Sequence, residues 1–491
     1  MGKTAITPTR EENFPEWYQQ VVKQGELAQS SFVRGCMVIK PWGYSLWEKM
    51  KTVLDKEFKK HDVENAYFPL FIPLRFFAKE AKHVEGFAKE CAVVTHQRLE
   101  EKDGQLVPAD PLDEPLIVRP TSETIIGETF AQWIESYRDL PLKINQWCNI
   151  VRFEMRTRLF LRTTEILWQE GHTAHASYDE ALQMAKEMLE VYATFAKEYL
   201  AMPLIAGKKT ENEKFPGAEI TYALEGMMQD KKALQAGTSH FFAQNFSKVQ
   251  NIQFSDEEGN LQFAYTTSWG VTTRLVGALV MVHGDDNGLV IPPRIAPLHL
   301  VILPILHKPE FREKILKHCE ELKQELEGIH YHGCPLEVKI DQRDLRGGEK
   351  LWSWVKKGVP MILEIGPKDL ETQSITFLRR DLDKKEQITK AQFLSSVTSY
   401  LDEMQENIYK RAKDLLDSHT FDVHSKEELM TALKKPGFYR CFLKDDPKIE
   451  EELKEWQLTV RCIPFDQPKT GGRCILSNEE NCQRVIVAKA Y

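Results

Sequence analysis

One stretch of the chain carries side chains that could handle a phosphorylated substrate. Strand alternation over NQWCNIVRFEM, residues 145–155, predicts a face shared by Cys148, Ile150, Arg152 and Glu154. A basic loop follows, with Arg156, Arg158 and Arg162, and ILWQEGH then alternates so that one face holds Trp168, Glu170 and His172. The pattern predicts a strand, a basic loop and a second strand.

Such a hairpin suits a nucleoside triphosphate. The planar guanidinium of Arg152 can form two hydrogen bonds with the α-phosphate, while the loop arginines bind the outer phosphates. Taken alone, the pattern leaves open an ordinary hairpin with a surface ion pair between Arg152 and Glu154. The chain has no GxxxxGK[ST] segment that would indicate a phosphate-binding loop of the other common type.

The surrounding elements divide the chain into three blocks. In the first block, residues 42–59 have helical spacing and Ala66–Ile72 reads as an apolar strand interrupted by Pro69. A turn-rich and proline-rich stretch, residues 283–294, predicts a boundary near 297. Strands over 298–305, 336–340, 361–365 and 374–380 alternate with helices over 309–328 and 349–357, which indicates an α/β domain. An amphipathic stretch from Met404 to His419 opens the third block.

Composition narrows the function classes. The 491 residues include 42% hydrophobic and 28% charged residues, which is normal for a globular protein. No apolar run is long enough to span a membrane, and nine scattered cysteines suit a reduced compartment, so we expect a cytoplasmic protein. The net charge of −8 implies that any contact with nucleic acid is local.

Several motifs give the chain a family resemblance. RPTSET, VRFE, LFLRTTEILWQEGHTAHA, QAGTSH and SWGVTTR resemble, in this order, the class II prolyl-tRNA synthetases of archaeal and eukaryotic type. The segment ENAYFPLFIP resembles the first class II motif, which would place Pro69 at a homodimer interface. The resemblance implies an α/β and α+β multidomain protein. It would comprise a class II catalytic domain built on an antiparallel sheet (1–296), an α/β anticodon-binding domain (297–405) and a small α+β C-terminal domain (406–491).

The resemblance also implies a proline site. Thr121, Glu123 and Arg152 would hold the amino and carboxylate groups, and a snug apolar pocket over the ring would be formed by Phe87, Trp168, His172 and His240. A carboxylate and a hydroxyl suit a secondary ammonium, and a guanidinium suits a carboxylate. Thr121 and Ser122 also suit a helix N-cap after Pro120, and the two roles are compatible.

For ATP, the family pattern implies contacts from Arg152, Glu154, Leu161, Arg162, Gln235, Thr238, Thr272 and Arg274, with Arg152, Glu154 and Arg274 as the catalytic group. Arg274 would stack on adenine. Ile166 stands where the family usually has a phenylalanine on the other face of the base. Magnesium would accompany the triphosphate.

The two later domains carry less specific signals. The resemblance suggests anticodon contacts from Glu364, Lys368, Arg379 and Arg380, although solvated charges at strand ends explain them equally well. At family zinc positions the chain has Lys444, Ile449 and Leu476, and only Cys474 remains. Zinc needs about four N or S donors, so we expect no structural zinc; regrouping of Cys441, Cys462, Cys474 and Cys482 is the alternative.

Together these features predict an enzyme that activates L-proline with ATP and transfers it to its tRNA, working as a homodimer. Residues 173–267 leave no room for a large editing insertion. A non-catalytic synthetase-like binding or regulatory protein is the alternative from another class, but it should have lost Glu123 and the arginines. Another class II amino-acid specificity is distinguished by RPTSET and GTSH.

Overall fold

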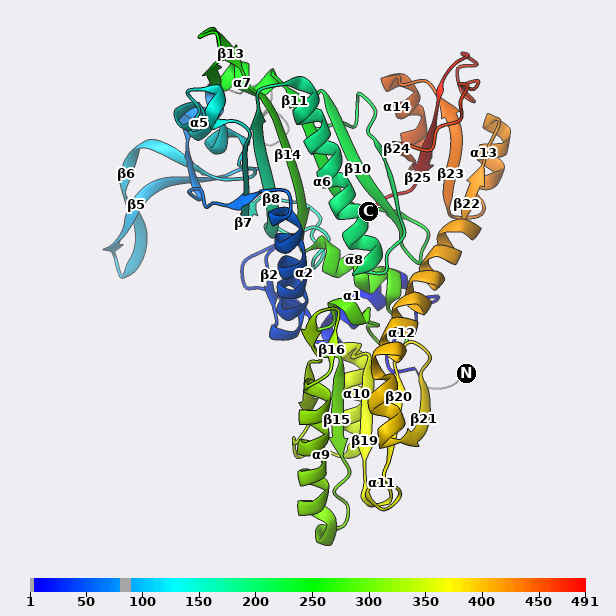
Figure 1. Ribbon diagram of the computed structural model, residues 1–491. Helices are drawn as coiled ribbons and strands as arrows, with labels where there is room; N and C mark the ends of the chain where they lie inside the picture. Colours follow the sequence, from blue (N-terminus) through cyan, green and yellow to red (C-terminus); the bar gives the residue numbers. More distant parts are fainter. Residues whose placement is uncertain (1–3, 80–89) are drawn as a thin grey trace.

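The computed structural model describes residues 4–79 and 90–491. Figure 1 shows a broad upper part built on a large sheet and a narrower column below it, which holds the segment from β15 to β21. Within the described ranges, no helix is long and apolar enough to cross a membrane.

Eleven of the described strands form one sheet, in the order β22-β23-β25-β24-β9-β10-β11-β14-β8-β7-β3. Neighbours are antiparallel except at the two ends, where β22 pairs with β23 and β3 with β7 in parallel. The strands are β3 (Glu64–Asn65), β7 (Leu142–Val151), β8 (Glu165–His175), β9 (Leu204–Lys208), β10 (Ile220–Met227), β11 (Ala233–Ala243), β14 (Tyr265–Thr272), β22 (Thr420–Asp422), β23 (Phe438–Leu443), β24 (Thr459–Pro464) and β25 (Gln483–Ala488). The predicted hairpin is confirmed by β7 and β8, which are antiparallel neighbours.

Helices cover the core of this sheet. They are α1 (Phe14–Gln24), α2 (Pro41–Lys59), α6 (Tyr178–Glu198) and α8 (Arg274–His283). The helix predicted over 42–59 is confirmed by α2. Helix α6 begins where the Ser177 hydroxyl accepts the Glu180 N–H, and its apolar residues recur every three or four positions, so one face is buried against β11 and β14.

A long arm and several small elements flank the sheet. The arm is a sheet of β4 (Phe71–Pro73), β6 (Gln105–Val118) and β5 (Ala92–Lys102), and it projects away from the core in Figure 1. The small elements are β1 (Ala28–Ser30), β2 (Met37–Ile39), α3 (Leu74–Lys79), α5 (Glu123–Trp133), η1 (Tyr137–Asp139), α7 (Asn245–Gln250), β12 (Gln253–Ser255), β13 (Leu261–Phe263) and η2 (Pro293–Ile295).

The prediction of a strand over Ala66–Ile72 is wrong for most of that segment. Only its last two residues lie in β4, and the stretch before them is irregular. Pro69 has no N–H for a strand ladder. Instead, the Phe68 N–H donates to the Gln146 side chain at 3.1 Å and the Arg119 guanidinium donates to the Phe68 carbonyl at 2.7 Å.

The lower column is the predicted α/β domain. Its sheet has the order β18-β15-β19-β20-β21, in which β15 is parallel to β18 and β19. Its elements are β15 (Leu300–Pro304), η3 (Pro309–Phe311), α9 (Arg312–Glu327), β16 (His330–Tyr331), β17 (Cys334–Pro335), β18 (Val338–Ile340), α10 (Gly347–Lys357), β19 (Met361–Ile365), α11 (Pro367–Thr372), β20 (Ser374–Arg379) and β21 (Lys384–Thr389).

Helix α12 (Lys390–Ser418) leads from this column to the last part of the chain. The helix begins at a capping box in which Thr389 and Gln392 bond each other's backbone N–H, and it buries Phe393, Val397, Leu401, Met404 and Ile408 at helical spacing. The helix therefore starts well before the predicted Met404. The boundary predicted at 405/406 falls inside it, and the domain limits stay a prediction.

The last part contains α13 (Lys426–Ala432), α14 (Pro447–Glu455) and strands β22 to β25. It is α+β, as predicted, but it is not separate from the main sheet. Strand β24 pairs with β9 (Ile463 opposite Lys208, Pro464 opposite Gly207), so the sheet runs without a break into the catalytic part of the chain. The chain end returns to the main sheet, where the Tyr491 N–H donates to the Ala233 carbonyl at 3.1 Å.

Candidate active site

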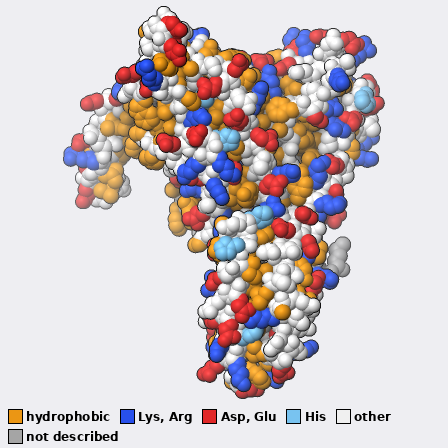
Figure 2. Space-filling view, in the orientation of Figure 1, with side chains coloured by type: hydrophobic (Ala, Val, Ile, Leu, Met, Phe, Trp, Pro, Cys, Tyr) orange, Lys and Arg blue, Asp and Glu red, His pale blue; other side chains and the backbone are white. Residues whose placement is uncertain are grey.

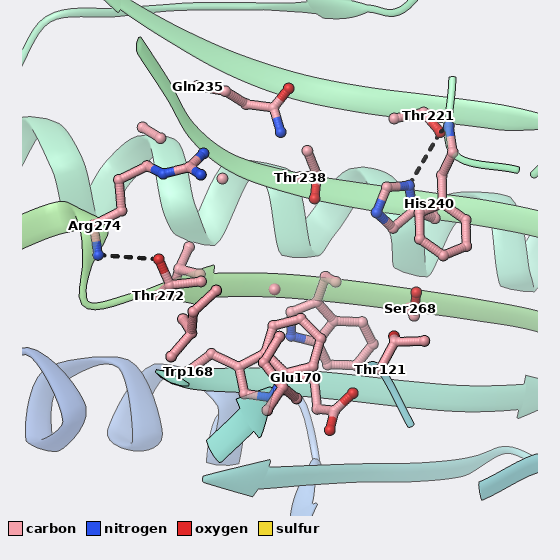
Figure 3. A pocket seen from close by; sticks show the side chains of 18 of the residues that line it. Thr121, Trp168, Glu170, Thr221, Gln235, Thr238, His240, Ser268, Thr272 and Arg274 are labelled. Atoms are coloured by element: carbon pink, nitrogen blue, oxygen red, sulfur yellow. Dashed lines mark hydrogen bonds between the residues drawn. The ribbon is translucent and has the colours of Figure 1, made fainter. Parts of the chain in front are cut away.

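Four antiparallel strands bring the predicted site residues onto one face. Strand register places residues in rows across β8, β14 and β11: Trp168 opposite Thr272; Glu170 opposite Gly270 and Thr238; His172 opposite Ser268 and His240. Directly opposed residues of antiparallel strands project to the same side. A pocket of about 320 Å³ lies over these rows. Figure 3 shows Arg274, Gln235 and Thr272 toward one end and Thr121, Ser268 and His240 toward the other.

Most of the predicted substrate residues line this pocket. They are Thr121, Glu123, Arg152, Leu161, Trp168, His172, Gln235, Thr238, His240, Thr272 and Arg274. Glu154 and Arg162 lie on the loop after β7 and outside the pocket wall. They form an ion pair in which 3.7 Å separates an Arg162 guanidinium nitrogen from a Glu154 carboxylate oxygen. Strand β7 ends at Val151, so the predicted strand face does not extend to Arg152 and Glu154. Phe87 lies outside the described residues.

Two buried titratable side chains, Glu170 and His172, lie at the end of the pocket that Thr121, Ser268 and His240 mark. Glu170 is 2% exposed; it accepts hydrogen bonds from Ser122 at 2.5 Å and Gln146 at 2.6 Å, and its other oxygen lies 3.0 Å from His172 Nε2. Burial raises the pKa of Glu170, but His172, Ser122 and Gln146 outweigh it and hold this pKa below its usual value. Burial lowers the pKa of His172, but the hydrogen bond and the charge of Glu170 outweigh burial, so the pKa of His172 lies above its usual value. Each partner therefore favours the charged form of the other.

This pair corrects the prediction of an apolar wall at His172. The imidazole cannot act as an apolar surface because its Nε2 is committed to a buried carboxylate. Ser122 is the N-cap residue of α5 by position, but its hydroxyl bonds Glu170 and makes no cap hydrogen bond. The Thr121 hydroxyl donates to Glu123, so these two side chains form one polar group at the pocket rim.

The other side of this end is aromatic. Burial, followed by the charge of His172, lowers the pKa of His240 to about 3, so the ring is neutral. Its Nδ1 lies 3.0 Å from the Thr221 hydroxyl, and the Phe215 ring packs against it with 4.7 Å between centroids. With Trp168, these rings give a compact, mostly apolar cavity that suits a small saturated ring.

Arg152 lines the pocket beside Trp168. Its Nε donates to the Pro120 carbonyl at 2.8 Å, and its guanidinium lies 5.7 Å from the Trp168 ring centroid. Burial lowers the pKa of Arg152, with nearby carboxylates acting in the opposite direction, and a guanidinium keeps its charge at neutral pH. A charged planar group held in this way can bind a carboxylate or a phosphate.

A cluster of positive charge marks the opposite end. Arg274 opens α8, and its Nε donates to the Leu161 carbonyl at 3.2 Å. Burial lowers the pKa of Arg274 to about 10, and the charges of Arg162 and Arg152 add to this effect. A buried arginine that has two further cations close enough to lower its pKa favours an anionic ligand, as a triphosphate would be.

The sequence analysis missed several pocket residues. Lys209, Glu213, Lys214 and Phe215 come from the loop after β9. Tyr491 does not line the pocket but contacts Arg162 beside it. The Tyr491 carbonyl accepts from Arg162 at 3.4 Å, and its hydroxyl donates to Asp230 at 2.7 Å. Glu170 is also a pocket residue outside the predicted site list, and it is the one with a signal in the sequence, because it alternates with Trp168 and His172. The residues named above reach the site through contacts between distant segments.

Known families match three parts of the chain, and known proteins match it over its whole length. The description "tRNA synthetase class II core domain (G, H, P, S and T)" matches residues 105–283, "Anticodon binding domain" matches 299–400, and "Prolyl-tRNA synthetase, C-terminal" matches 426–491. A proline–tRNA ligase of Protochlamydia amoebophila is 56% identical over 501 residues, covering 100% of this chain and 99% of that protein. The proline–tRNA ligase 2 of Anaeromyxobacter dehalogenans is 54% identical, with the same coverage.

The chain belongs to the proline–tRNA ligase family.

The anticodon-binding domain of this family member corrects two predicted contacts. Arg380 is 1% exposed, and its guanidinium binds Asp285 of the catalytic part at 2.5 Å and Asp383 at 3.0 Å. Arg379 is 4% exposed and bonded to Asp381 and Glu403. Both are structural ion pairs and cannot face an anticodon. The other two residues predicted to contact the anticodon are Glu364 and Lys368. Glu364 forms an ion pair with Lys385 at 2.6 Å, and Lys368 is exposed.

The C-terminal region of the ligase keeps one family zinc position as cysteine. The Cys474 sulfur accepts backbone N–H groups of Lys444 at 3.4 Å and Ser477 at 3.3 Å. Burial raises the pKa of this thiol, but these hydrogen bonds outweigh burial and the net shift is downward. Ile449 is in the apolar core with Leu476 beside it. Among the described residues, no group of three or more His, Cys, Asp or Glu is arranged to hold a metal, and the zinc content stays a prediction.

Proposed function

We propose that this proline–tRNA ligase forms prolyl-adenylate from L-proline and ATP, with release of pyrophosphate, and transfers proline to the 3′-terminal ribose of its tRNA. The observation that carries the proposal is the single pocket that joins a carboxylate-and-hydroxyl rim, an aromatic cavity and a cluster of arginines. Each part matches one portion of the two substrates: the ammonium, the pyrrolidine ring and the triphosphate.

Proline binding would use the amino-acid end. Glu123 and Thr121 accept the secondary ammonium, and Trp168 and His240 pack on the ring. Arg152, which lines the same pocket, binds the carboxylate and also neutralises charge on the α-phosphate that this carboxylate attacks. The ion pair of Glu170 and His172 holds Ser122 at the start of α5 and so keeps the rim rigid.

ATP binding would use the other end. Arg274 stacks on adenine, with Ile166 on the opposite side of the site, and Gln235, Thr238 and Thr272 provide polar contacts. Leu161 adds an apolar contact, and Arg162 binds the outer phosphates from the loop. Magnesium neutralises phosphate charge when it is bound. Glu154 is the only carboxylate among the predicted nucleotide residues, so it fits the preference of this ion for oxygen ligands.

The chemical step needs little proton transfer. The proline carboxylate is an anion at neutral pH and attacks the α-phosphorus in line, while pyrophosphate leaves on the opposite side. Positioning and relief of charge in the transition state therefore supply the rate enhancement. Arg152 is the residue of this chain that we assign both to positioning the carboxylate and to relieving charge in the transition state.

We also place the enzyme in the cytoplasm as a homodimer that binds the anticodon of its tRNA. Support for the dimer comes from large apolar side chains exposed around Pro69: Tyr67 (72%), Phe71 (43%), Leu74 (41%) and Trp133 (50%). Figure 2 shows apolar side chains along the β5–β6 arm as well, where Val93, Leu99 and Leu106 are exposed. Lys368 is the exposed cation we retain for the anticodon.

Proline-dependent exchange of labelled pyrophosphate into ATP tests the proposal. Proline should support exchange, and other amino acids should support much less. Folded protein that gives no exchange with any amino acid would favour a non-catalytic binding protein, and exchange with a different amino acid alone would show another class II specificity.

A further inference from the structure

The pocket wall that the sequence analysis missed is held by the C-terminal domain. The wall is the loop between β9 and β10, residues 209–219, which contributes Lys209, Lys214 and Phe215 to the pocket. Its first four residues each bond the C-terminal part of the chain. The contacts are Lys209 Nζ to the Arg461 carbonyl (2.7 Å), Thr210 Oγ1 to Glu450 (2.6 Å), the Glu211 N–H to Asp445 (3.1 Å) and Asn212 Nδ2 to Glu450 (2.6 Å).

Glu450 is central to this contact. It lies on α14, is 4% exposed, and uses one carboxylate oxygen for Thr210 and the other for Asn212. Thr210 is 3% exposed, and its carbonyl accepts the backbone N–H groups of Glu213 at 3.2 Å and Lys214 at 3.0 Å. Glu450 therefore fixes the residue around which the loop turns.

The loop carries this constraint to the amino-acid end of the pocket. The Phe215 N–H donates to the Thr221 hydroxyl at 2.9 Å, and the same hydroxyl lies 3.0 Å from His240 Nδ1. The Phe215 ring packs on His240. A shift of Thr210 would move Phe215 relative to His240, while Arg274, Gln235 and Thr272 lie toward the other end of the pocket and outside this loop.

We infer that Glu450 of the C-terminal domain is a positioning residue for the amino-acid end of the pocket, acting through Thr210 and Asn212 on the placement of Phe215 against His240. The inference rests on the proposed function, since it assigns that end of the pocket to proline. It also gives the C-terminal domain a role in substrate binding that does not require zinc.

The test compares two variants with a control in the full-length protein. Glu450→Ala removes both hydrogen bonds, and Thr210→Val removes one while keeping the shape of the side chain. Glu451→Ala, on an exposed carboxylate of the same helix, is the control. Pyrophosphate exchange gives KM for proline, KM for ATP and kcat, and thermal unfolding sets a temperature at which every variant is folded.

Glu450→Ala should raise KM for proline by about tenfold, because small displacements of binding groups weaken binding strongly, with KM for ATP unchanged. Thr210→Val should change the same constant in the same direction, and the double variant should be no worse than Glu450→Ala, as expected for one shared interaction. The control should match the wild type. An unchanged KM for proline in both variants would overturn the inference, as would an equal rise in both KM values. A wild type without proline-dependent exchange would instead refute the proposed function.

Discussion

Removal of Arg461 should destabilise the junction between the catalytic sheet and the C-terminal domain. Arg461 lies on β24, and its guanidinium makes three contacts with the Glu225 carboxylate of β10, at 3.1, 3.2 and 3.0 Å. Glu225 is 0% exposed, and its other cationic partner is Lys209 at 2.9 Å. Arg461→Met keeps an unbranched apolar stem in place of the arginine's aliphatic part but leaves Glu225 with one cation in place of two.

The magnitude follows from burial. Breaking a buried ion pair by removing one partner costs about 3 to 5 kcal/mol, because the remaining charge stays out of water. Lys209 still neutralises Glu225, so we expect the lower end, about 3 kcal/mol. For a domain of ordinary size this lowers Tm by roughly 6 to 12 °C.

Differential scanning calorimetry measures the effect, and Arg440→Met on β23, which is separated from β24 by β25 in the same sheet, is the matched control. Arg440 pairs with Asp422, whose side chain is 51% exposed, and such a surface pair contributes at most about 1 kcal/mol. A decrease in Tm no larger than that of the control would refute the reasoning.

Four further predictions concern catalysis by Arg152, zinc content, hydrolysis of mischarged tRNA and the ion pair between Asp285 and Arg380. Arg152→Ala should lower the rate of adenylate formation by about 10²- to 10³-fold with the fold intact; pyrophosphate exchange above half the wild-type rate would remove Arg152 from the catalytic group. Elemental analysis should find no stoichiometric zinc, and one chelator-resistant zinc per chain would show that the cysteines have regrouped. The tRNA for proline, mischarged with alanine beforehand, should lose its alanine at the spontaneous rate in the presence of the enzyme, since residues 173–267 leave no room for an editing insertion. Faster loss of alanine would reveal a hydrolytic site. Burial raises the pKa of Asp285, but the hydrogen bonds and charge of Arg380 outweigh burial, so the pKa lies below its usual value of 3.8. The ion pair between Asp285 and Arg380 therefore stabilises the fold at neutral pH. This contribution to the free energy of unfolding is lost as the pH falls through the lowered pKa. The difference in unfolding free energy between wild type and Asp285→Asn should therefore shrink below about pH 4 in chemical denaturation, and a constant difference would contradict it.

Local patterns predicted the elements that carry the chemistry. Helix α2, the β7–β8 hairpin and the α/β domain follow from periodicity, because their buried faces repeat along the chain. The prediction failed at residues 66–70, where the backbone is held by the side chains of Arg119 and Gln146. No property of that segment itself indicates these partners.

The sequence by itself determined the family, the β7–β8 hairpin and eleven of the residues that line the pocket, since motif order and strand alternation are properties of the chain. Only the tertiary structure decided which charges are available to a substrate. Arg379 and Arg380 look like solvated strand-end cations in the sequence, but burial and carboxylates from other segments make them structural. The same holds for the loop at 209–219, the chain end at Tyr491 and Glu450: their roles come from contacts between residues more than 200 positions apart, such as Thr210 and Glu450, and such distances are set by the fold.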